Sequence, residues 1–273
     1  MGFQLNTVII TGASNGIGEE MAYQLASQGA WLTLAARNEE KLQAVAKRCE
    51  ILGSHMRGRV IIVPTDVTNE QECQALIEKT VQEYGRLDTL VNNAGKIMSA
   101  NFEEMETLEP FHQLMNVNYF GAVYCTKYAL PYLKQTSGRL VAVSSLLGRV
   151  AVPTYSGYVA SKFALTGFFN TLRTELQESN VSVTILSPGS VDSGMHQRGF
   201  GADGKPLGDT GKTADGGMNV ETCVKRMLKA IDKRKREELF TLFNYTAVVT
   251  DAVAPSVVEY VARRQVKHRT ESD

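Results

Sequence analysis

Cysteine is scarce in this sequence, and the few cysteines present form no recognisable site. The four residues, at positions 49, 73, 125 and 223 of a chain of 273, make no CxxC pair. His112 and His196 likewise have no partner at the spacing of metal ligands. We therefore predict no metal site and no redox motif, and we expect reduced thiols in a cytoplasmic protein.

An excess of charge of either sign is also missing. Lysine and arginine together number 29, and so do aspartate and glutamate, which gives a net charge of zero at pH 7. This balance gives no general reason to expect nucleic acid or a membrane surface as a partner. The basic run at 233–236 is interpreted as a solvated turn between a helix and a short strand at 238–242.

Long hydrophobic runs are absent as well. No run approaches the roughly 20 apolar residues of a membrane-spanning helix, and the first residues do not have the pattern of a signal peptide. The nearest candidate contains two acidic residues and a proline, so we interpret residues 246–265 as an amphipathic segment that serves as a lid, an interface or a surface contact. The basic residues 263–269 leave peripheral membrane contact open, although a solvated helix end is the favoured interpretation.

The sequence does contain a regular alternation of apolar runs and amphipathic stretches. The runs are short and apolar throughout, as strands buried on both faces should be. Helical patterns such as residues 16–28 and 70–84 lie between them. This alternation predicts an α/β fold with a doubly wound, Rossmann-type parallel sheet, three layers in all, in a single domain over residues 1–273. The predicted strands are 7–11, 31–35, 60–63, 89–91, 140–144 and 181–186.

One segment breaks this pattern. Residues 194–217 are rich in glycine and polar side chains and show neither a helical nor a strand period. They follow a predicted core strand, and in a doubly wound sheet the carboxyl ends of the strands face the ligand crevice. We interpret the segment as a substrate loop or lid, with a disordered surface insertion as the alternative.

A glycine-rich turn directly follows the first predicted strand. The sequence TGASNGIG at residues 11–18 spaces its glycines as GxxxGxG and opens the first helical pattern. A strand–turn–helix unit of this kind points backbone N–H groups and the positive end of the helix dipole at a pyrophosphate. The predicted cofactor contacts in this turn are Gly12, Ser14, Asn15, Gly16, Ile17 and Gly18.

The end of the second strand distinguishes between the two nicotinamide dinucleotides. NAD sites usually carry an acidic residue there for the ribose 2′-hydroxyl, whereas an arginine accommodates the 2′-phosphate of NADP. Here Arg37 and Asn38 follow the strand, with no acid at its end. Because a guanidinium binds phosphate in a bidentate manner, we predict NADP(H) as the cofactor. An ordinary surface arginine is the alternative.

A tyrosine and a lysine four residues apart indicate the chemistry. Tyr158 and Lys162 share one face of a predicted helix. Free tyrosine has a pKa of about 10, and a neighbouring ammonium group favours the phenolate and lowers that pKa. Such a tyrosine donates a proton to the alkoxide formed when a ketone is reduced, or abstracts one in the reverse direction. Ser144 or Ser145, at the end of a predicted strand, would hold the carbonyl oxygen.

Together these motifs resemble those of the classical short-chain dehydrogenases/reductases over nearly the whole chain, in the family's order and at its spacing. The resemblance is greatest to the 11β-hydroxysteroid dehydrogenase-like branch, including the member 7B-type reductases. The stretch AARNEEKL also resembles 3-ketodihydrosphingosine reductases. The matching motifs are TGASNGIG at 11–18, Asp66-Val67, NNAG at 92–95, Asn118, Ser145, YVASK at 158–162 and Pro188-Gly189.

The resemblance implies roles for further residues. The family's offset to the tyrosine selects Ser145 over Ser144. Its motif also selects Asn118 over Asn116 as the residue holding a water that relays protons to the lysine. Tyr158 and Lys162 are expected to contact the cofactor as well. The other implied contacts are Asp66 and Val67 beside the adenine, Asn93, Ala94 and Gly95 under the ribose, and Pro188, Gly189, Val191 and Ser193 at the nicotinamide.

The sequence thus predicts an NADP(H)-dependent oxidoreductase that interconverts a carbonyl and an alcohol by hydride transfer, with Tyr158 as general acid–base. A mostly apolar predicted pocket favours a steroid, long-chain or aromatic carbonyl. The alternatives are a non-catalytic NADP(H) sensor on the same fold, a 3-ketosphinganine-type reductase, and an epimerase or dehydratase. Outside the loop, the predicted pocket residues are Leu146, Leu147, Val150, Val152 and Tyr155.

The resemblance also implies self-association. Members of the family commonly pair the helices that correspond here to residues 108–133 and 155–179. The second of these has small residues on its apolar face, which suits close helix packing. We therefore expect a homodimer or a homotetramer.

Overall fold

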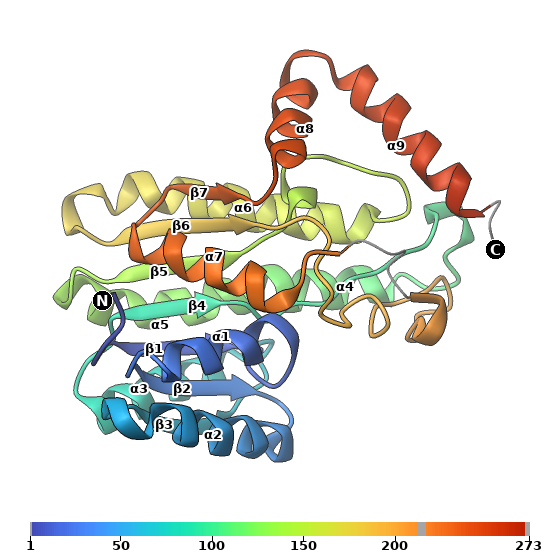
Figure 1. Cartoon of the computed structure of the whole chain (residues 1–273). Coiled ribbons are helices and arrows are strands. Elements are labelled where there is room, and N and C mark those ends of the chain that lie inside the picture. Colours follow the sequence, from blue (N-terminus) through green and yellow to red (C-terminus); the bar gives the residue numbers. More distant parts are fainter. Residues whose placement is uncertain (1, 212–216, 271–273) are drawn as a thin grey trace.

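A parallel sheet of seven strands forms the centre of the molecule (Figure 1). The computed structural model describes residues 2–211 and 217–270. The strand order β3-β2-β1-β4-β5-β6-β7 reverses direction between β1 and β4, which confirms the predicted doubly wound topology. The strands are β1 (Thr7–Thr11), β2 (Trp31–Ala36), β3 (Arg59–Pro64), β4 (Thr89–Asn92), β5 (Arg139–Val143), β6 (Ser182–Ser187) and β7 (Glu237–Leu239).

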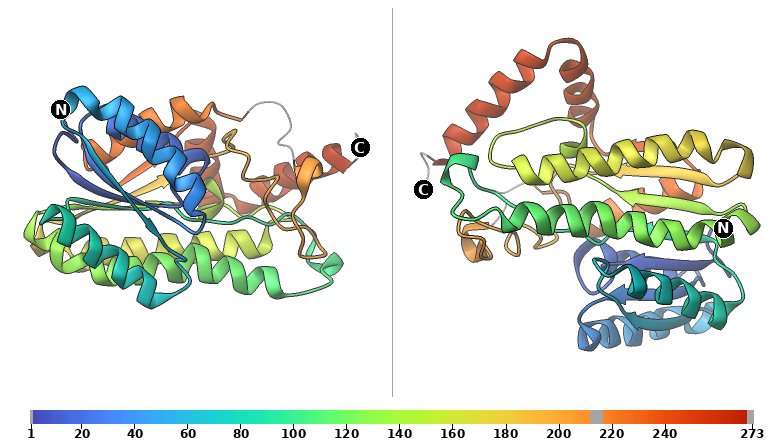
Figure 2. Two further views of the ribbon diagram at one scale, coloured as in Figure 1. Left: turned by 90° about the horizontal axis from the view of Figure 1, so that it is seen from below. Right: turned by 180° about the vertical axis from the view of Figure 1, so that it is seen from behind.

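Helices cover both faces of the sheet, giving the predicted three layers (Figure 2). Each face has its own hydrophobic core. Helices α1 (Gly16–Ala26), α2 (Glu39–Gly53) and α7 (Val220–Asp232) pack on one face. Helices α3 (Glu70–Tyr84), α5 (Gly121–Gln135) and α6 (Ser156–Glu175) pack on the other.

The central strand β1 shows why these strands read as continuous apolar runs. Every residue of β1 is buried. Val8 and Ile10 face the core beneath α1, whereas Ile9 faces the core beneath α3 and α5. Successive strand residues point to opposite faces, so a strand covered on both sides needs apolar residues at every position. Each fully buried isoleucine contributes about 1.5–3 kcal/mol of transfer free energy.

One helix on the second face contains an unpredicted irregularity. Helix α4 (Glu109–Met115) continues through a π-helical turn, Asn116–Phe120, directly into α5. The turn buries Asn118 and leaves Asn116 exposed. The helix predicted over 108–133 therefore exists, but its register changes at the turn, so the residues before and after it face in different directions.

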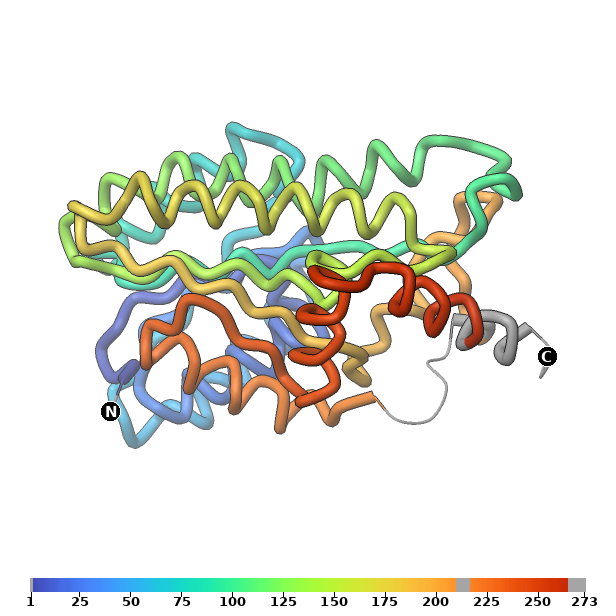
Figure 3. The backbone as a smooth tube through the Cα atoms, turned by 90° about the horizontal axis from the view of Figure 1, so that it is seen from above, coloured from blue at the N-terminus to red at the C-terminus, as the bar shows by residue number. Residues whose placement is uncertain are grey.

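The C-terminal segment forms two helices that project beyond the sheet as an arch (Figures 1 and 3). Helix α8 (Leu242–Val253) and helix α9 (Pro255–Thr270) are separated by Ala254, whose extended φ of −148° suits the residue before a proline. The amphipathic segment predicted at 246–265 is thus helical but broken at Pro255. The predicted strand 238–242 is wrong at its end, because Leu242 begins α8. No helix of the described part is both long and apolar enough to cross a membrane.

The segment predicted as a substrate loop is irregular where it is described. Only a short 3₁₀ turn, Gly208–Gly211, interrupts it, and residues 212–216 of the predicted range lie outside the described residues. Phe200 ties the loop down, because its backbone bridges to Met98 and its ring joins a small cluster that includes Tyr158. The loop therefore packs over the carboxyl end of the sheet.

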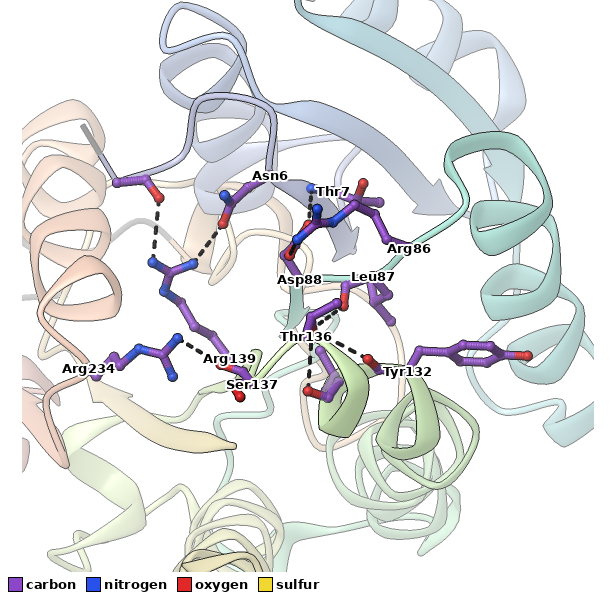
Figure 4. Close-up of polar contacts among 12 residues, drawn as sticks. Asn6, Thr7, Arg86, Leu87, Asp88, Tyr132, Thr136, Ser137, Arg139 and Arg234 are labelled. Atoms are coloured by element: carbon purple, nitrogen blue, oxygen red, sulfur yellow. Dashed lines mark hydrogen bonds and ion pairs between the residues drawn. The ribbon is translucent and has the colours of Figure 1, made fainter. Parts of the chain in front are cut away.

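The opposite, amino edge of the sheet is held by polar contacts within the chain (Figure 4). Asp88 accepts a hydrogen bond from Thr7 N at 2.9 Å and forms an ion pair with Arg86 at 2.6 Å. Arg139 donates to Asn6 at 2.7 Å, and Arg234 donates to backbone carbonyls at the start of β5. Arg234 belongs to the basic run 233–236, which does form the predicted turn. These contacts join the amino ends of β1, β4 and β5, although Arg139 Nε and Thr7 Oγ1 are buried there without a hydrogen-bond partner among the described residues.

Candidate active site

The glycine turn after β1 is shaped for close approach by a ligand. Gly12 and Gly16 have positive φ angles of 67° and 59°. A Cβ on Gly12 would lie 2.9 Å from Ala94 Cα. Thr11 Oγ1 accepts hydrogen bonds at 3.0 Å from the backbone N–H groups of Asn93 and Ala94. These bonds hold the end of β4 against the glycine turn. The space beside the turn is bordered by backbone atoms, and a side chain at the glycine positions would fill it.

A cavity of about 1500 Å³ opens beside this turn at the carboxyl edge of the sheet. Its volume exceeds the 300–1,000 Å³ typical of a small-molecule site, so it has room for a dinucleotide together with a second molecule. Every predicted catalytic or cofactor residue lines it except Gly18 and Asn118. The glycine cradle, the cavity and these residues fit a nicotinamide dinucleotide.

The two exceptions lie directly behind the cavity wall. A Cβ on Gly18 would come within 2.3 Å of Gly12 O, so this glycine allows α1 to pack closely against the turn. Asn118 accepts a hydrogen bond from Lys96 N at 2.8 Å, and its amide donates to Lys96 O and Ser161 Oγ at 2.9 Å. Asn118 therefore holds the chain that follows β4. Its implied part in a proton relay stays a prediction.

The polar groups of the catalytic set converge on the cavity from β5 and α6. Tyr158 and Lys162 lie on one face of α6 and are both buried. Ser145 follows β5 and hydrogen-bonds the Tyr158 hydroxyl. Ser144 points the other way and bonds Thr166 Oγ1 at 2.9 Å. Both serines border the cavity, but the Ser144 hydroxyl is engaged with Thr166, whereas the Ser145 hydroxyl is the one beside Tyr158.

The acidity of Tyr158 differs from the expectation raised by the sequence. Burial raises the pKa of Tyr158 to about 12, and the hydrogen bond with Ser145 lowers it only in part. The sequence predicts that Lys162 lowers this pKa. That expectation is wrong for the protein alone, because desolvation of the phenolate outweighs the stabilising contacts. Lys162 Nζ instead donates a hydrogen bond to Val143 O at 2.9 Å and lies 5.7 Å from the centre of the tyrosine ring.

The other end of the cavity carries cations on α2 and on the turn before it. Arg37 follows β2, and its guanidinium lies 4.0 Å from Asp66 while the side chain remains 66% exposed. Asn38 caps α2 by accepting a hydrogen bond from Lys41 N at 2.8 Å. Lys41 also lines the cavity, whereas the two glutamates that open α2 do not. A phosphate placed here would meet two cations and a helix N-terminus.

Several cavity residues were not predicted. Lys41 could have been predicted from the sequence, because it lies four residues after Arg37 at the start of a helix. Lys96 and Arg198 had no such signal, since an irregular segment shows no direction for its side chains. The same holds for side chains of the C-terminal arch, whose position depends on tertiary packing. The arch contributes Phe243, Ala247, Val258, Val261 and Ala262.

A family model described as short chain dehydrogenase matches residues 6–202 of this sequence. The chain belongs to the short-chain dehydrogenase family. This confirms the resemblance seen in its motifs. The matched part includes the glycine turn, the strands β1 to β6 and all four predicted catalytic residues.

Curated relatives place this short-chain dehydrogenase in the 11β-hydroxysteroid dehydrogenase-like branch. Over 188 residues it is 42% identical to 11-beta-hydroxysteroid dehydrogenase-like 3 of Arabidopsis thaliana, covering 69% of this chain and 60% of the relative. Over 254 residues it is 34% identical to 11-beta-hydroxysteroid dehydrogenase-like 2 of the same plant, covering 93% and 79%. The chain thus spans about three fifths of the length of the first of these relatives.

A solved dehydrogenase shares the fold. An alcohol dehydrogenase from the archaeon Thermococcus sibiricus, complexed with 5-hydroxy-NADP, superposes with a TM-score of 0.72 at 26% identity, covering 86% of this chain and 95% of that one. A nicotinamide dinucleotide, of the kind bound in this solved neighbour, also fits the cavity of this chain. The cofactor supplies or accepts the hydride when bound.

The buried ammonium group of Lys162 predicts a measurable dependence of stability on pH. Burial lowers the pKa of Lys162 to about 8, below the ordinary 10.5. Between these values the unfolded chain binds more protons than the folded chain, so the lysine's contribution to stability rises with pH. From about pH 7.5 to about pH 9.5, the free energy of unfolding of the cofactor-free protein should rise by about 2 kcal/mol relative to Lys162→Met.

Urea unfolding of both proteins at the two pH values measures this effect. Both proteins contain the same buried thiols, so the contribution of the thiols to the pH dependence of unfolding cancels in the comparison. A difference between the two proteins that stays constant with pH would show that Lys162 keeps an ordinary pKa in the folded state.

Proposed function

We propose that the protein is an NADP(H)-dependent oxidoreductase that interconverts a lipophilic carbonyl and the corresponding alcohol. One observation carries this proposal. Tyr158, Ser145 and Lys162 face the same cavity as the glycine turn and the cations that follow β2. A non-catalytic NADP(H) sensor would need the turn and Arg37 but none of these three side chains.

In the proposed reduction, the three side chains act on the carbonyl oxygen. With a pKa of about 12, Tyr158 holds its proton at neutral pH and is the proton donor to the oxygen as it gains negative charge. The Ser145 hydroxyl stabilises the same charge by a hydrogen bond. The Lys162 ammonium would favour the tyrosinate that is left after transfer. In oxidation the same groups act in reverse.

The preference for NADP(H) is supported by the adenosine end of the cavity. Arg37 and Lys41 offer positive charge beside the N-terminus of α2, and no acidic residue ends β2 to bind a ribose 2′-hydroxyl. Asp66 lies close enough to orient Arg37 but does not neutralise Lys41. A 2′-phosphate fits this set of charges better than a hydroxyl does.

A lipophilic substrate is supported by the walls around Tyr158. The segment after β5 supplies apolar side chains to the cavity, and the C-terminal arch supplies more from the other side. Burial of apolar surface, rather than pairing of charges, would then contribute most of the substrate's binding free energy. The predicted residues Leu146, Leu147, Val150, Val152 and Tyr155 all line this part.

We also propose a cytoplasmic homodimer or homotetramer. The helices predicted to pair leave large aromatic side chains exposed, namely Phe120 at 40% and Phe163 at 43%. Exposed aromatic residues on neighbouring helices suit an interface between copies of the chain.

Cofactor preference tests the proposal at Arg37. Oxidation of NADPH and NADH is measured against a panel of steroid, long-chain and aromatic ketones. Arg37→Ala should raise the KM for NADPH by about 10- to 100-fold and leave that for NADH within about twofold, because a charge-assisted bond to phosphate contributes about 1.5–3 kcal/mol. Equal use of both cofactors by the wild type would overturn the assignment.

Lys47→Ala provides the matched control. Lys47 is an exposed cation on the same helix α2 but does not line the cavity. Its removal should change neither KM. Tight binding of NADPH without turnover of any carbonyl or alcohol would instead favour a sensor.

A further inference from the structure

Arg198 crosses from the substrate loop to the glycine turn. Its guanidinium lines the cavity and donates hydrogen bonds to Asn15 Oδ1 at 2.9 Å and to Ser193 O at 3.1 Å. The two ends of this contact are distant in sequence, because Asn15 follows β1 and Arg198 follows β6. Arg198 therefore joins the loop to the glycine turn by a side-chain hydrogen bond.

The partners of this guanidinium are neutral. Burial lowers the pKa of Arg198 from its ordinary value, with no contribution from a nearby charge. Among the described residues, none of the ion pairs includes Arg198. The side chain remains partly exposed, and within the protein an amide oxygen and a carbonyl accept the hydrogen bonds of its charged group.

Arg198 also lies beside a helix N-terminus. Asn15 is the N-cap of α1, so the guanidinium lies at the positive end of that helix. The Asn15 side chain makes no capping hydrogen bond to the helix, and its oxygen accepts from Arg198. The acidic residue of the first turn, Glu19, accepts a hydrogen bond from the Tyr23 hydroxyl instead. A cation and a positive helix end next to each other are both stabilised by one bound anion.

We propose that Arg198 binds the diphosphate of the nicotinamide dinucleotide and thereby fastens the substrate loop over the cofactor. This inference rests on the proposed function, in which the dinucleotide occupies the cradle of the glycine turn. The diphosphate is the anion that a strand–turn–helix unit of this kind receives, and a guanidinium binds its oxygens in a bidentate manner.

The consequence is that cofactor binding also positions one wall of the substrate site. The loop that carries Arg198 also supplies Met195, Phe200 and Leu207 to the cavity. A contact between Arg198 and the diphosphate holds these apolar side chains in place. Arg198 thus links the two halves of the cavity and is a positioning residue for the substrate wall.

Dinucleotide binding to Arg198 variants tests the proposal without relying on turnover. The Kd values for NADPH and NADH are measured by nicotinamide fluorescence. Arg198→Met should raise both by the same factor, about tenfold, because both cofactors contain the diphosphate. Arg198→Lys should recover part of the loss, since it restores the charge. Amide hydrogen exchange at residues 193–200 should slow when NADP⁺ is added to the wild type, but not when it is added to Arg198→Met.

Two comparisons distinguish this contact from other effects. Lys205→Met removes an exposed cation of the same loop that does not line the cavity, and it should leave both Kd values unchanged. Arg37→Ala should weaken NADPH alone. The melting temperature of the ligand-free Arg198→Met protein should stay within about 2 °C of wild type, because the cation is unfavourably placed without an anion.

Three outcomes would overturn the inference: unchanged Kd values in Arg198→Met, a loss confined to NADPH, or a loss explained by a lower melting temperature of the ligand-free protein. Failure of the wild type to bind either dinucleotide would overturn the proposed function as well, and is therefore distinguishable from all three.

Discussion

Tyr158→Phe is expected to lower kcat/KM for carbonyl reduction by about 10³-fold, within the range measured for loss of a general acid–base. The substitution removes one oxygen from a buried side chain whose hydroxyl is bonded to Ser145. No second hydroxyl of comparable position can donate the proton, because Ser145 itself is far less acidic than a phenol. The Kd for NADPH should change by no more than about threefold, since the ring that is predicted to contact the cofactor remains.

Tyr155→Phe is the matched control for this result. Tyr155 lines the same cavity three residues earlier, and its ring lies 6.2 Å from that of His196. Loss of its hydroxyl should change kcat by no more than about threefold. If Tyr158→Phe kept more than about a tenth of wild-type activity, or if Tyr155→Phe lost as much, the proton donor would be a different group.

Ser145→Ala is expected to reduce kcat/KM by about 10²-fold. In the proposed reaction its hydroxyl stabilises the carbonyl oxygen as charge builds on it, and loss of one such donor typically costs about 10²–10³-fold in rate. The variant should fold normally, because the Ser145 hydroxyl only accepts a bond from Leu147 N at 3.1 Å in addition to its contact with Tyr158.

The neighbouring Ser144→Ala should show the opposite pattern. Its hydroxyl bonds Thr166 inside the protein, so its loss should lower the free energy of unfolding by about 1 kcal/mol and leave kcat nearly unchanged. Steady-state kinetics and urea unfolding on both variants measure the two effects. Comparable rate losses in the two variants would indicate that the serines act through the local backbone, not through the carbonyl.

Local patterns in the sequence were sufficient to predict the fold, the glycine turn and the Tyr158–Lys162 pair, whereas the cofactor contacts after β3, β4 and β6 were implied by the family resemblance. Strands buried on both faces are apolar at every position, as in β1, and a turn that binds a diphosphate needs glycines at defined places. The spacing of Tyr158 and Lys162 likewise places both on one face of α6. Each of these inferences uses residues that are neighbours in the chain.

The features that were missed depend on contacts between distant segments. The pKa of Tyr158 is set by how deeply the folded chain buries it, which the identity of its neighbour Lys162 does not show. Arg198 and Asn15 are separated by most of the sequence, and neither is part of a periodic pattern that would orient it. The break before Pro255 was visible as a proline, but the direction of α9 after it was not.

The π-helical turn at Asn116–Phe120 constrains the number of residues between the start of α4 and the end of α5. Relative to an α-helix, such a turn holds one additional residue, so it behaves as a tolerated insertion in α4–α5. Deleting one residue there would restore α-helical pairing and leave the flanking parts of the helix in nearly the same orientation, but it would remove the widened turn that carries Asn118. Asn118 would then turn away from Lys96 and Ser161. A related sequence that is one residue shorter at this point would therefore lack the contacts by which Asn118 holds the chain after β4.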